Sequence, residues 1–244
     1  MPAAAAPLMN DFLELLAWYL AFLLSTSFHE GAHAWVARWL GDPTAYLGGQ
    51  ASLDPTPHIR REPFGMVILP VLSLFFLGWP LGFASVPVDP NWSHRFPRKA
   101  GKVALAGPAA NLVLVLLAGL LIRVGLALGG LAPPVELSFE QLARPAAGEG
   151  AMPWAGVSLI LSVFFTLNLV LLLFNLLPLP PMDGATVVNL LLPESAARSF
   201  QEALRQPFVG ILGLILAWTV FPEIFVPVFR FAMNLLYSGI LIFA

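Results

Sequence analysis

The sequence has no cysteine and very little charge, and both shortages limit what the protein can be. Without cysteine it has neither disulfides nor thiolate ligands, so any metal must be bound by nitrogen and oxygen atoms. Charged residues make up 11% of the chain and hydrophobic residues 58%, whereas soluble domains carry about a quarter charged residues. The net charge of -2 offers no basic surface for nucleic acid. This composition predicts a membrane protein.

Long apolar runs predict an all-α polytopic membrane protein with about five transmembrane helices, since a spanning helix needs about 20 mostly apolar residues. The whole chain, 1–244, is expected to form a single transmembrane domain, with a catalytic core at about residues 10–190 and a C-terminal helical pair within 207–243. The expected spans are residues 12–40, 103–128, 155–177, 207–221 and 224–243, the last two separated by Pro222 and Glu223.

Residues 64–79 are apolar but short for a span, and the following "LGFASVPVDP" is rich in proline. We expect a re-entrant or short membrane hairpin that returns as extended chain, which is tolerated at membrane depth only when protein or water covers its backbone. The sequence leaves open whether 64–79 spans or re-enters. Residues 193–206 are expected to form a short polar helix.

Basic residues predict how the chain is oriented in the cell membrane, because lysine and arginine gather on the cytoplasmic side. The loop at 129–153 holds only Arg144, whereas the other loops are basic. We therefore expect the N-terminus outside and the basic loops in the cytoplasm. These loops carry Arg60, Arg61, Arg95, Arg98, Lys99, Lys102, Arg198 and Arg205.

The stretch "FHEGAH" places His29, Glu30 and His33 in an H-E-x-x-H pattern within the first predicted span. Residues at i and i+4 lie on one helical face, so both imidazoles can bind one Zn²⁺, and Glu30 can accept a proton from water beside it. Two histidines at the membrane interface, with a glutamate that caps the polar end of the helix, could also produce this pattern. Ionisable residues inside a membrane helix are costly, however, and usually functional.

A catalytic zinc needs a third protein ligand. Asp183 stands out because it follows a long apolar run and the proline-rich "PLPP". It could be a metal ligand or the N-cap of a helix that starts near Ala185, and the residues alone do not decide between the two. The other candidates, most of them in polar loops, are Asp42, Asp54, His58, Glu62, Asp89 and His94.

Asn111 and Asn175 are polar residues in predicted spans. Each could contact the substrate backbone or stabilise the oxyanion of a transition state. Each could equally form a hydrogen bond between helices.

Three motifs in this order resemble the site-2 protease family of intramembrane zinc metalloproteases: H-E-x-x-H at 29–33, "AGPAAN" at 106–111 and "NLLPLPPMDG" at 175–184. The wording "FHEGAHAWVARWLGDPTA" is similar to the compact bacterial and archaeal branch, which lacks a PDZ domain. The resemblance covers roughly residues 20–190. The segment after His58 is more charged than in that branch, so no role for His58 follows.

The resemblance implies a zinc metalloendopeptidase with a core of three transmembrane helices. His29, His33 and Asp183 would bind one Zn²⁺ per chain near the cytoplasmic side, and Glu30 would be the catalytic base. The substrate would be a transmembrane protein or peptide within the lipid bilayer, cleaved either to release a tethered factor or to clear remnant peptides. The alternatives are a metal-ion transporter that uses the same His/Asp cluster and an inactive scaffold. The sequence indicates no oligomeric state.

Overall fold

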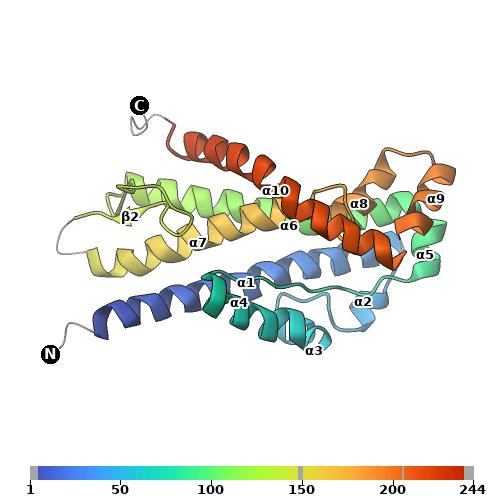
Figure 1. The fold of residues 1–244 in the computed structure, drawn as a ribbon, viewed down its shortest axis with the longest axis horizontal. Helices are drawn as coiled ribbons and strands as arrows, with labels where there is room; N and C mark the ends of the chain where they lie inside the picture. The colour runs from blue at the N-terminus through green and yellow to red at the C-terminus, as the bar shows by residue number, and fades with distance from the viewer. Residues whose placement is uncertain (1–4, 148–150, 205, 239–244) are drawn as a thin grey trace.

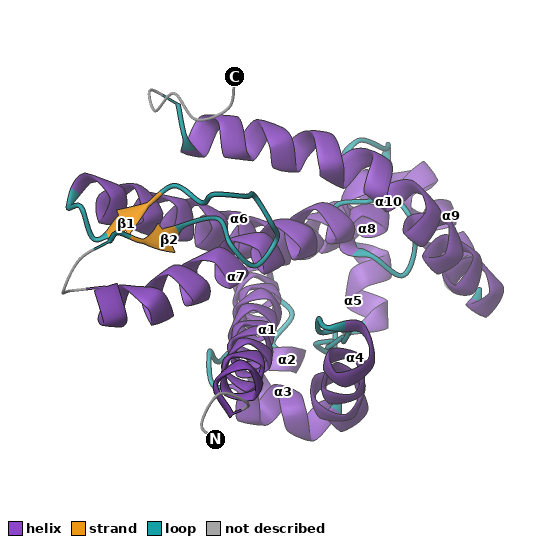
Figure 2. Ribbon diagram, turned by 60° about the vertical axis from the view of Figure 1, so that its left-hand side comes forward, coloured by secondary structure: helices purple, strands orange, loops and turns teal. Residues whose placement is uncertain are grey.

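The computed structural model describes residues 5–147, 151–204 and 206–238. Three long helices, α1 (Ala5–Leu40), α6 (Pro97–Ala127) and α7 (Ala151–Asn175), pack against one another, and α10 (Pro207–Leu236) packs against α7 on the outside (Figures 1 and 2). The shorter elements are α2 (Thr44–Leu47), α3 (Pro55–Arg61), the π-helix η1 (Phe64–Ile68), α4 (Leu69–Leu77), α5 (Pro90–Arg95), β1 (Leu131–Ala132), β2 (Arg144–Pro145), α8 (Asp183–Val187), the 3₁₀-helix η2 (Val188–Leu190) and α9 (Glu194–Leu204).

Within the described residues, 4 helices are long and apolar enough to cross a membrane. They are Phe12–Leu40, Pro97–Ala127, Pro153–Asn175 and Phe208–Leu236. The prediction of an all-α polytopic membrane protein is therefore confirmed. The short polar helix expected at 193–206 is present as α9.

The C-terminal part forms one helix, not the expected pair, because Pro222 and Pro227 lie inside α10 without ending it. A proline removes one backbone hydrogen bond, but membrane helices tolerate this where neighbouring groups satisfy the freed carbonyl. A helix ending at residue 221 would also be only about 22 Å long, which is too short for a hydrocarbon core of about 30 Å. As a result, α10 ends near the same end of the molecule as the start of α1 (Figure 1).

The segment after α3 forms the expected hairpin. Its helical arm, Phe64–Leu77, is shorter than a span, and residues 79–89 then return as extended chain to α5 (Figure 1). Two backbone amides attach the returning chain to the helical arm: Phe83 N–H donates to Gly65 O at 3.1 Å, and Leu81 N–H donates to Ser73 Oγ at 2.7 Å. The extended chain therefore has one edge bonded within the hairpin.

Asp42 joins the end of α1 to the end of the extended chain. The helix stops at Gly41, whose φ of 103° is a conformation that favours glycine. The Asp42 carboxylate then accepts Thr44 N–H at 2.9 Å through Oδ1 and Asp89 N–H at 2.8 Å through Oδ2. The extended chain is thus held beside the half of α1 that carries the histidines.

The opposite end of the molecule is covered by the 128–147 loop, in which β1 pairs with β2 in an antiparallel ladder. Phe139 from this loop packs against Phe225 and Phe229 of α10, with ring centroids 5.7 and 5.1 Å apart. Phe221 stacks on Phe225 at 5.4 Å, and Phe225 stacks on Phe229 at 5.6 Å. We call these four rings the aromatic ladder.

A candidate metal centre between α1, α6 and α8

The two histidines of the H-E-x-x-H motif lie on one face of α1, as their spacing predicts. His29, Glu30 and His33 are all buried, each with 6% of its surface exposed. The Nε2 atoms of the two histidines are 3.0 Å apart. The motif therefore places two ligand atoms side by side within a transmembrane helix.

Asp183 completes a group of three ligand atoms, although it lies 154 residues after His29. Its Oδ2 lies 3.0 Å from His29 Nε2 and 3.3 Å from His33 Nε2. It is the first residue of α8, and Met182 occupies the N-cap position, so Asp183 is free of the capping role that the sequence left open.

The Nδ1 atoms of both imidazoles lie beside hydrogen-bond acceptors, and the Nε2 atoms consequently face Asp183. His33 Nδ1 lies 2.7 Å from Val103 O, and a backbone carbonyl only accepts, so Nδ1–H is the donor. His29 Nδ1 lies 2.6 Å from Asn111 Oδ1. Both Nε2 atoms therefore point lone pairs at the same carboxylate oxygen, an arrangement that a cation between them stabilises.

The spacing of the three atoms fits zinc. Four-coordinate zinc binds nitrogen and oxygen at about 2.0–2.1 Å, which places neighbouring ligand atoms about 3.3 Å apart. The separations here are 3.0 to 3.3 Å. The donors, two neutral imidazoles and a carboxylate, are a set that zinc catalysis uses, and they leave room for a fourth ligand.

Gly107 of α6 makes room for this cluster. A Cβ atom at this position would clash with the Nε2 atoms of both His29 and His33. Gly107 precedes Pro108, which lies inside α6. The small residue of "AGPAAN" therefore allows the backbone of α6 to lie directly against the imidazoles.

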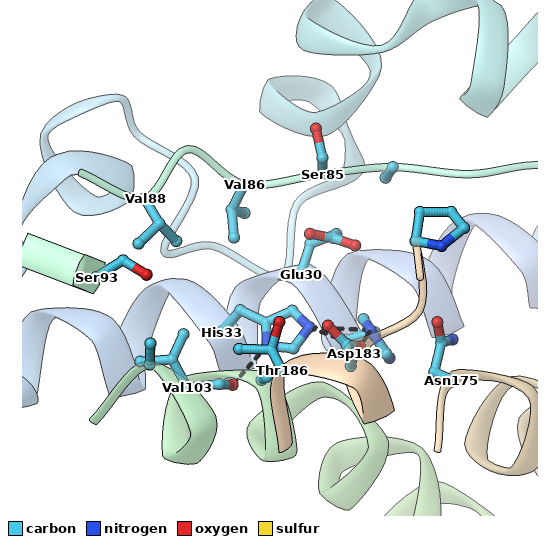
Figure 3. Close-up of a pocket in the computed structure, with 15 residues that line it drawn as sticks. Glu30, His33, Ser85, Val86, Val88, Ser93, Val103, Asn175, Asp183 and Thr186 are labelled. Atoms are coloured by element: carbon cyan, nitrogen blue, oxygen red, sulfur yellow. Dashed lines mark hydrogen bonds and ion pairs between the residues drawn. The ribbon is translucent and has the colours of Figure 1, made fainter. Parts of the chain in front are cut away.

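A cavity of about 300 Å³ opens beside the cluster. In Figure 3, Glu30 projects from α1 into this space, toward the extended chain that carries Ser85 and Val86. Val88 from the same chain and Asn175 at the end of α7 also line the cavity. The cavity thus brings the glutamate, the three potential ligands and the extended chain together.

The other candidate ligands serve local structure. His58 is fully buried and donates from Nε2 to Ser52 O at 3.1 Å, and Glu62 accepts a hydrogen bond from Ser85 Oγ at 2.7 Å. Asp54 caps α3 through Thr56 N–H at 2.8 Å, and this bond lowers the pKa of the Asp54 carboxyl. Asp89 caps α5, Asp42 has the role given above, and His94 pairs with Glu202 at 3.1 Å.

Asn111 and Asn175, for which the sequence offers the same two roles, lie in different environments. Asn111 is fully buried against His29, and it is not among the residues that line the cavity. Asn175 does line the cavity, while its Nδ2 donates to Leu171 O of its own helix at 3.0 Å. Only Asn175 is therefore placed where a substrate could reach it.

Sequence reasoning missed two contributors, the carbonyl of Val103 and Asn168, and it connected Gly107 with close helix packing but not with the histidines. Asn168 is fully buried and accepts a hydrogen bond from Asn111 Nδ2 at 2.9 Å. A signal for Asn168 existed, since it is an amide in the apolar run "TLNLVLLLFN" and polar groups at membrane depth are costly. Val103 acts through its backbone carbonyl, which side-chain patterns do not reveal.

The long apolar helices and the buried H-E-x-x-H cluster define a multi-pass membrane protein with a centre of the metallopeptidase type. The model of peptidase family M50 matches residues 17–218 of the chain. The chain belongs to this family and is a metalloendopeptidase, which confirms the resemblance to the site-2 proteases.

Two relatives show how far the similarity extends. The Bacillus subtilis (strain 168) protein named "Putative zinc metalloprotease YwhC" is 35% identical over 199 residues, which are 80% of this chain and 79% of that protein. The Mycobacterium tuberculosis (strain ATCC 25618 / H37Rv) protein named "Putative zinc metalloprotease Rip2" is 30% identical over 199 residues, which are 82% of this chain and 66% of that protein. No solved structure gives a significant match.

Proposed function

We propose that the protein is an intramembrane zinc protease that cleaves transmembrane segments of other membrane proteins. The observation that carries this proposal is the convergence of His29, His33 and Asp183 inside the helical core, beside a cavity that contains Glu30. A peptidase centre within transmembrane helices lies inside the membrane. The peptide bonds that can reach it there belong to the transmembrane segments of other proteins.

His29, His33 and Asp183 would hold one zinc ion per chain. The donor geometry supports this, and so do the relatives named as zinc metalloproteases. Zinc in such a site supplies Lewis acidity, which makes water a nucleophile at neutral pH and polarises a carbonyl.

Glu30 is the proton carrier in this proposal. Its carboxylate takes the proton of the attacking water and returns it to the amine that leaves, so that neither a strong base nor a charged amine forms in the cavity. Asn175, on the cavity wall, is placed to hold the substrate backbone or the developing oxyanion. The surrounding helices leave Glu30 with only 6% of its surface exposed.

The extended chain at 79–89 is suited to bind an unwound substrate by strand addition. A substrate helix must unwind before cleavage because its carbonyls are bonded within the helix. Leu81, Phe83 and Asp89 direct their N–H groups to the hairpin and to Asp42. Peptide groups alternate in direction along extended chain, so those of Ala84 and Val86 point the other way, where a substrate strand can pair with them.

The cytoplasmic side of the cell membrane is our proposed location for the metal centre. The end of the bundle nearer the centre carries α5 and α9 (Figure 1), and the basic residues Arg95, Arg98 and Lys99 lie in or beside α5. Loops rich in arginine and lysine remain in the cytoplasm. Substrates would therefore be cut near their cytoplasmic ends.

The test uses the full chain in lipid vesicles together with single-span peptides that carry glycine and proline in their apolar helix. Glu30→Gln should lower the rate of cleavage by about 10²–10⁴-fold while the variant keeps its zinc. Glu202→Gln, which changes an exposed glutamate on α9, is the matched control and should cleave at the wild-type rate. Removal of zinc with a chelator should stop cleavage, and added zinc should restore it. Cleavage by Glu30→Gln at the wild-type rate would refute the mechanism.

The same vesicles test the transporter alternative. Membership of a peptidase family disfavours it, and a transit site has no need of Glu30. Zinc uptake into the vesicles that depends on His29 and Asp183, without cleavage of any peptide, would favour it. Identification of the peptides held by Glu30→Gln in cell membranes would name the substrate.

A further inference from the structure

Four buried side chains form a circuit of hydrogen bonds through α1, α6 and α7. His29 Nδ1 lies 2.6 Å from Asn111 Oδ1, and Asn111 Nδ2 donates to Asn168 Oδ1 at 2.9 Å. Asn168 Nδ2 then donates to Ser25 Oγ at 2.8 Å, which leads back to α1 one helical turn before His29. Asn111, Asn168 and Ser25 have no exposed surface. The circuit therefore links the three core helices behind the metal centre.

One backbone carbonyl sets the direction of every bond in this circuit. Asn168 Nδ2 also donates to Phe164 O at 2.8 Å, and a carbonyl only accepts, so the amide nitrogen of Asn168 must face it. Oδ1 of Asn168 is then left to accept from Asn111 Nδ2. This orients Asn111 with its own Oδ1 toward His29, and the proton of His29 consequently lies on Nδ1.

Loss of the acceptor on Asn168 would remove this constraint. The amide of Asn111 could then turn over and present Nδ2 to His29 Nδ1, which would favour the proton on Nε2. Nε2 is the atom that faces Asp183 and His33. A protonated Nε2 has no lone pair for a metal.

We propose that Asn168 is a positioning residue that fixes the tautomer of His29 through Asn111 and thereby sets the metal affinity of the site. This inference rests on the zinc site proposed above. Outer partners of ligating histidines act in this way in metalloproteins, and their loss lowers metal affinity by about 10–100-fold. A residue that merely joins helices would contribute to stability and leave metal affinity unchanged.

The experiment measures Zn²⁺ affinity by chelator competition, and Co²⁺ affinity by visible absorbance, on the metal-free full chain in detergent micelles. Asn111→Ala should weaken binding by about 10–100-fold, and Asn168→Leu, which keeps the branched shape but can neither accept nor donate a hydrogen bond, by about 10-fold. Asn168→Ala is measured as well, in case the leucine variant fails to fold. The double variant of Asn111→Ala and Asn168→Leu should bind no more weakly than Asn111→Ala alone, because Asn168 acts only through Asn111.

Two further variants separate positioning from structure. Asn168→Asp should bind within about threefold of wild type, because a neutral carboxylic acid still accepts from Asn111 and donates to Phe164 O. Thr166→Val is the matched control: it removes a buried hydrogen bond of 2.8 Å to Phe139 O from the same helix. This control should lose stability without losing metal affinity.

Three results would overturn the inference. They are wild-type metal affinity in Asn168→Leu and Asn168→Ala, a double variant in which the two losses multiply, and an aspartate variant as weak as the leucine variant. Failure of the zinc site itself would look different, because His29→Ala would then bind metal as tightly as the wild type.

Discussion

Two helices of equal spanning length, Phe12–Leu40 and Phe208–Leu236, each 29 residues, are held in the molecule by different forces. Directional hydrogen bonds position α1, through Ser25, His29 and His33. Aromatic contacts to other elements hold α10: Phe139 of the 128–147 loop packs against Phe225 and Phe229, and Phe174 of α7 packs against Phe221 with ring centroids 5.2 Å apart. Inside a membrane, apolar packing competes with lipid tails that are equally apolar, so it gives cohesion with little directional control. The comparison indicates that chemistry depends on α1 and its partners, whereas α10 contributes stability.

The largest effect is expected from a substitution at Gly107 of α6, and a second glycine of the same helix provides the control. Gly107→Ala should lower zinc affinity by more than about 100-fold, exceeding the loss of an outer partner, because its Cβ would displace both imidazoles. Cleavage should be lost with the metal. Gly119→Ala is the control: its Cβ would lie 3.2 Å from Phe165 Cε2, which a small ring movement can relieve. Equal metal affinities in the two variants, by chelator competition, would contradict the role of Gly107.

A middle-sized effect is expected from Phe225→Ala, which removes the ladder ring that contacts Phe139, Phe221 and Phe229. Aromatic pairs contribute about 0.5–1.5 kcal/mol each, so the loss of these three pairs should lower the free energy of unfolding by about 1.5–4.5 kcal/mol, measured by denaturation in mixed micelles. Zinc affinity should stay at the wild-type value. A parallel loss of zinc would show that α10 also positions the ligands, and the comparison would fail.

The smallest effect is expected at the far end of α10. Arg123 Nη1 donates to Leu236 O and Ser238 O, both at 2.9 Å, and so binds the carbonyls that end the helix. Arg123→Met should cost about 1 kcal/mol of stability. Hydrogen exchange should become faster in the last turn of α10, with cleavage unchanged. Unaltered exchange there would show that Arg123 does not hold this end of the helix.

The sequence predicted those features that depend on short-range patterns. The spans containing α1, α6 and α7 follow from long apolar runs, and the pairing of His29 with His33 follows from helical spacing. The prediction of two C-terminal helices was wrong because Pro222 was expected to end a helix, as proline usually does in soluble proteins. In a membrane the chain gains more from an unbroken helix than it loses at one carbonyl.

The sequence by itself determined the membrane class, two of the potential ligands, the residue proposed as proton carrier and, through three ordered motifs, the family. The family resemblance implied Asp183 as a third ligand, but only the tertiary structure shows it beside the histidines, because helix packing brings together two positions that are 154 apart in the sequence. The same packing turned Asn111 away from the cavity and joined it to Asn168. Hydrogen-bond direction is set by which carbonyl lies beside which amide, and that is decided when the helices pack.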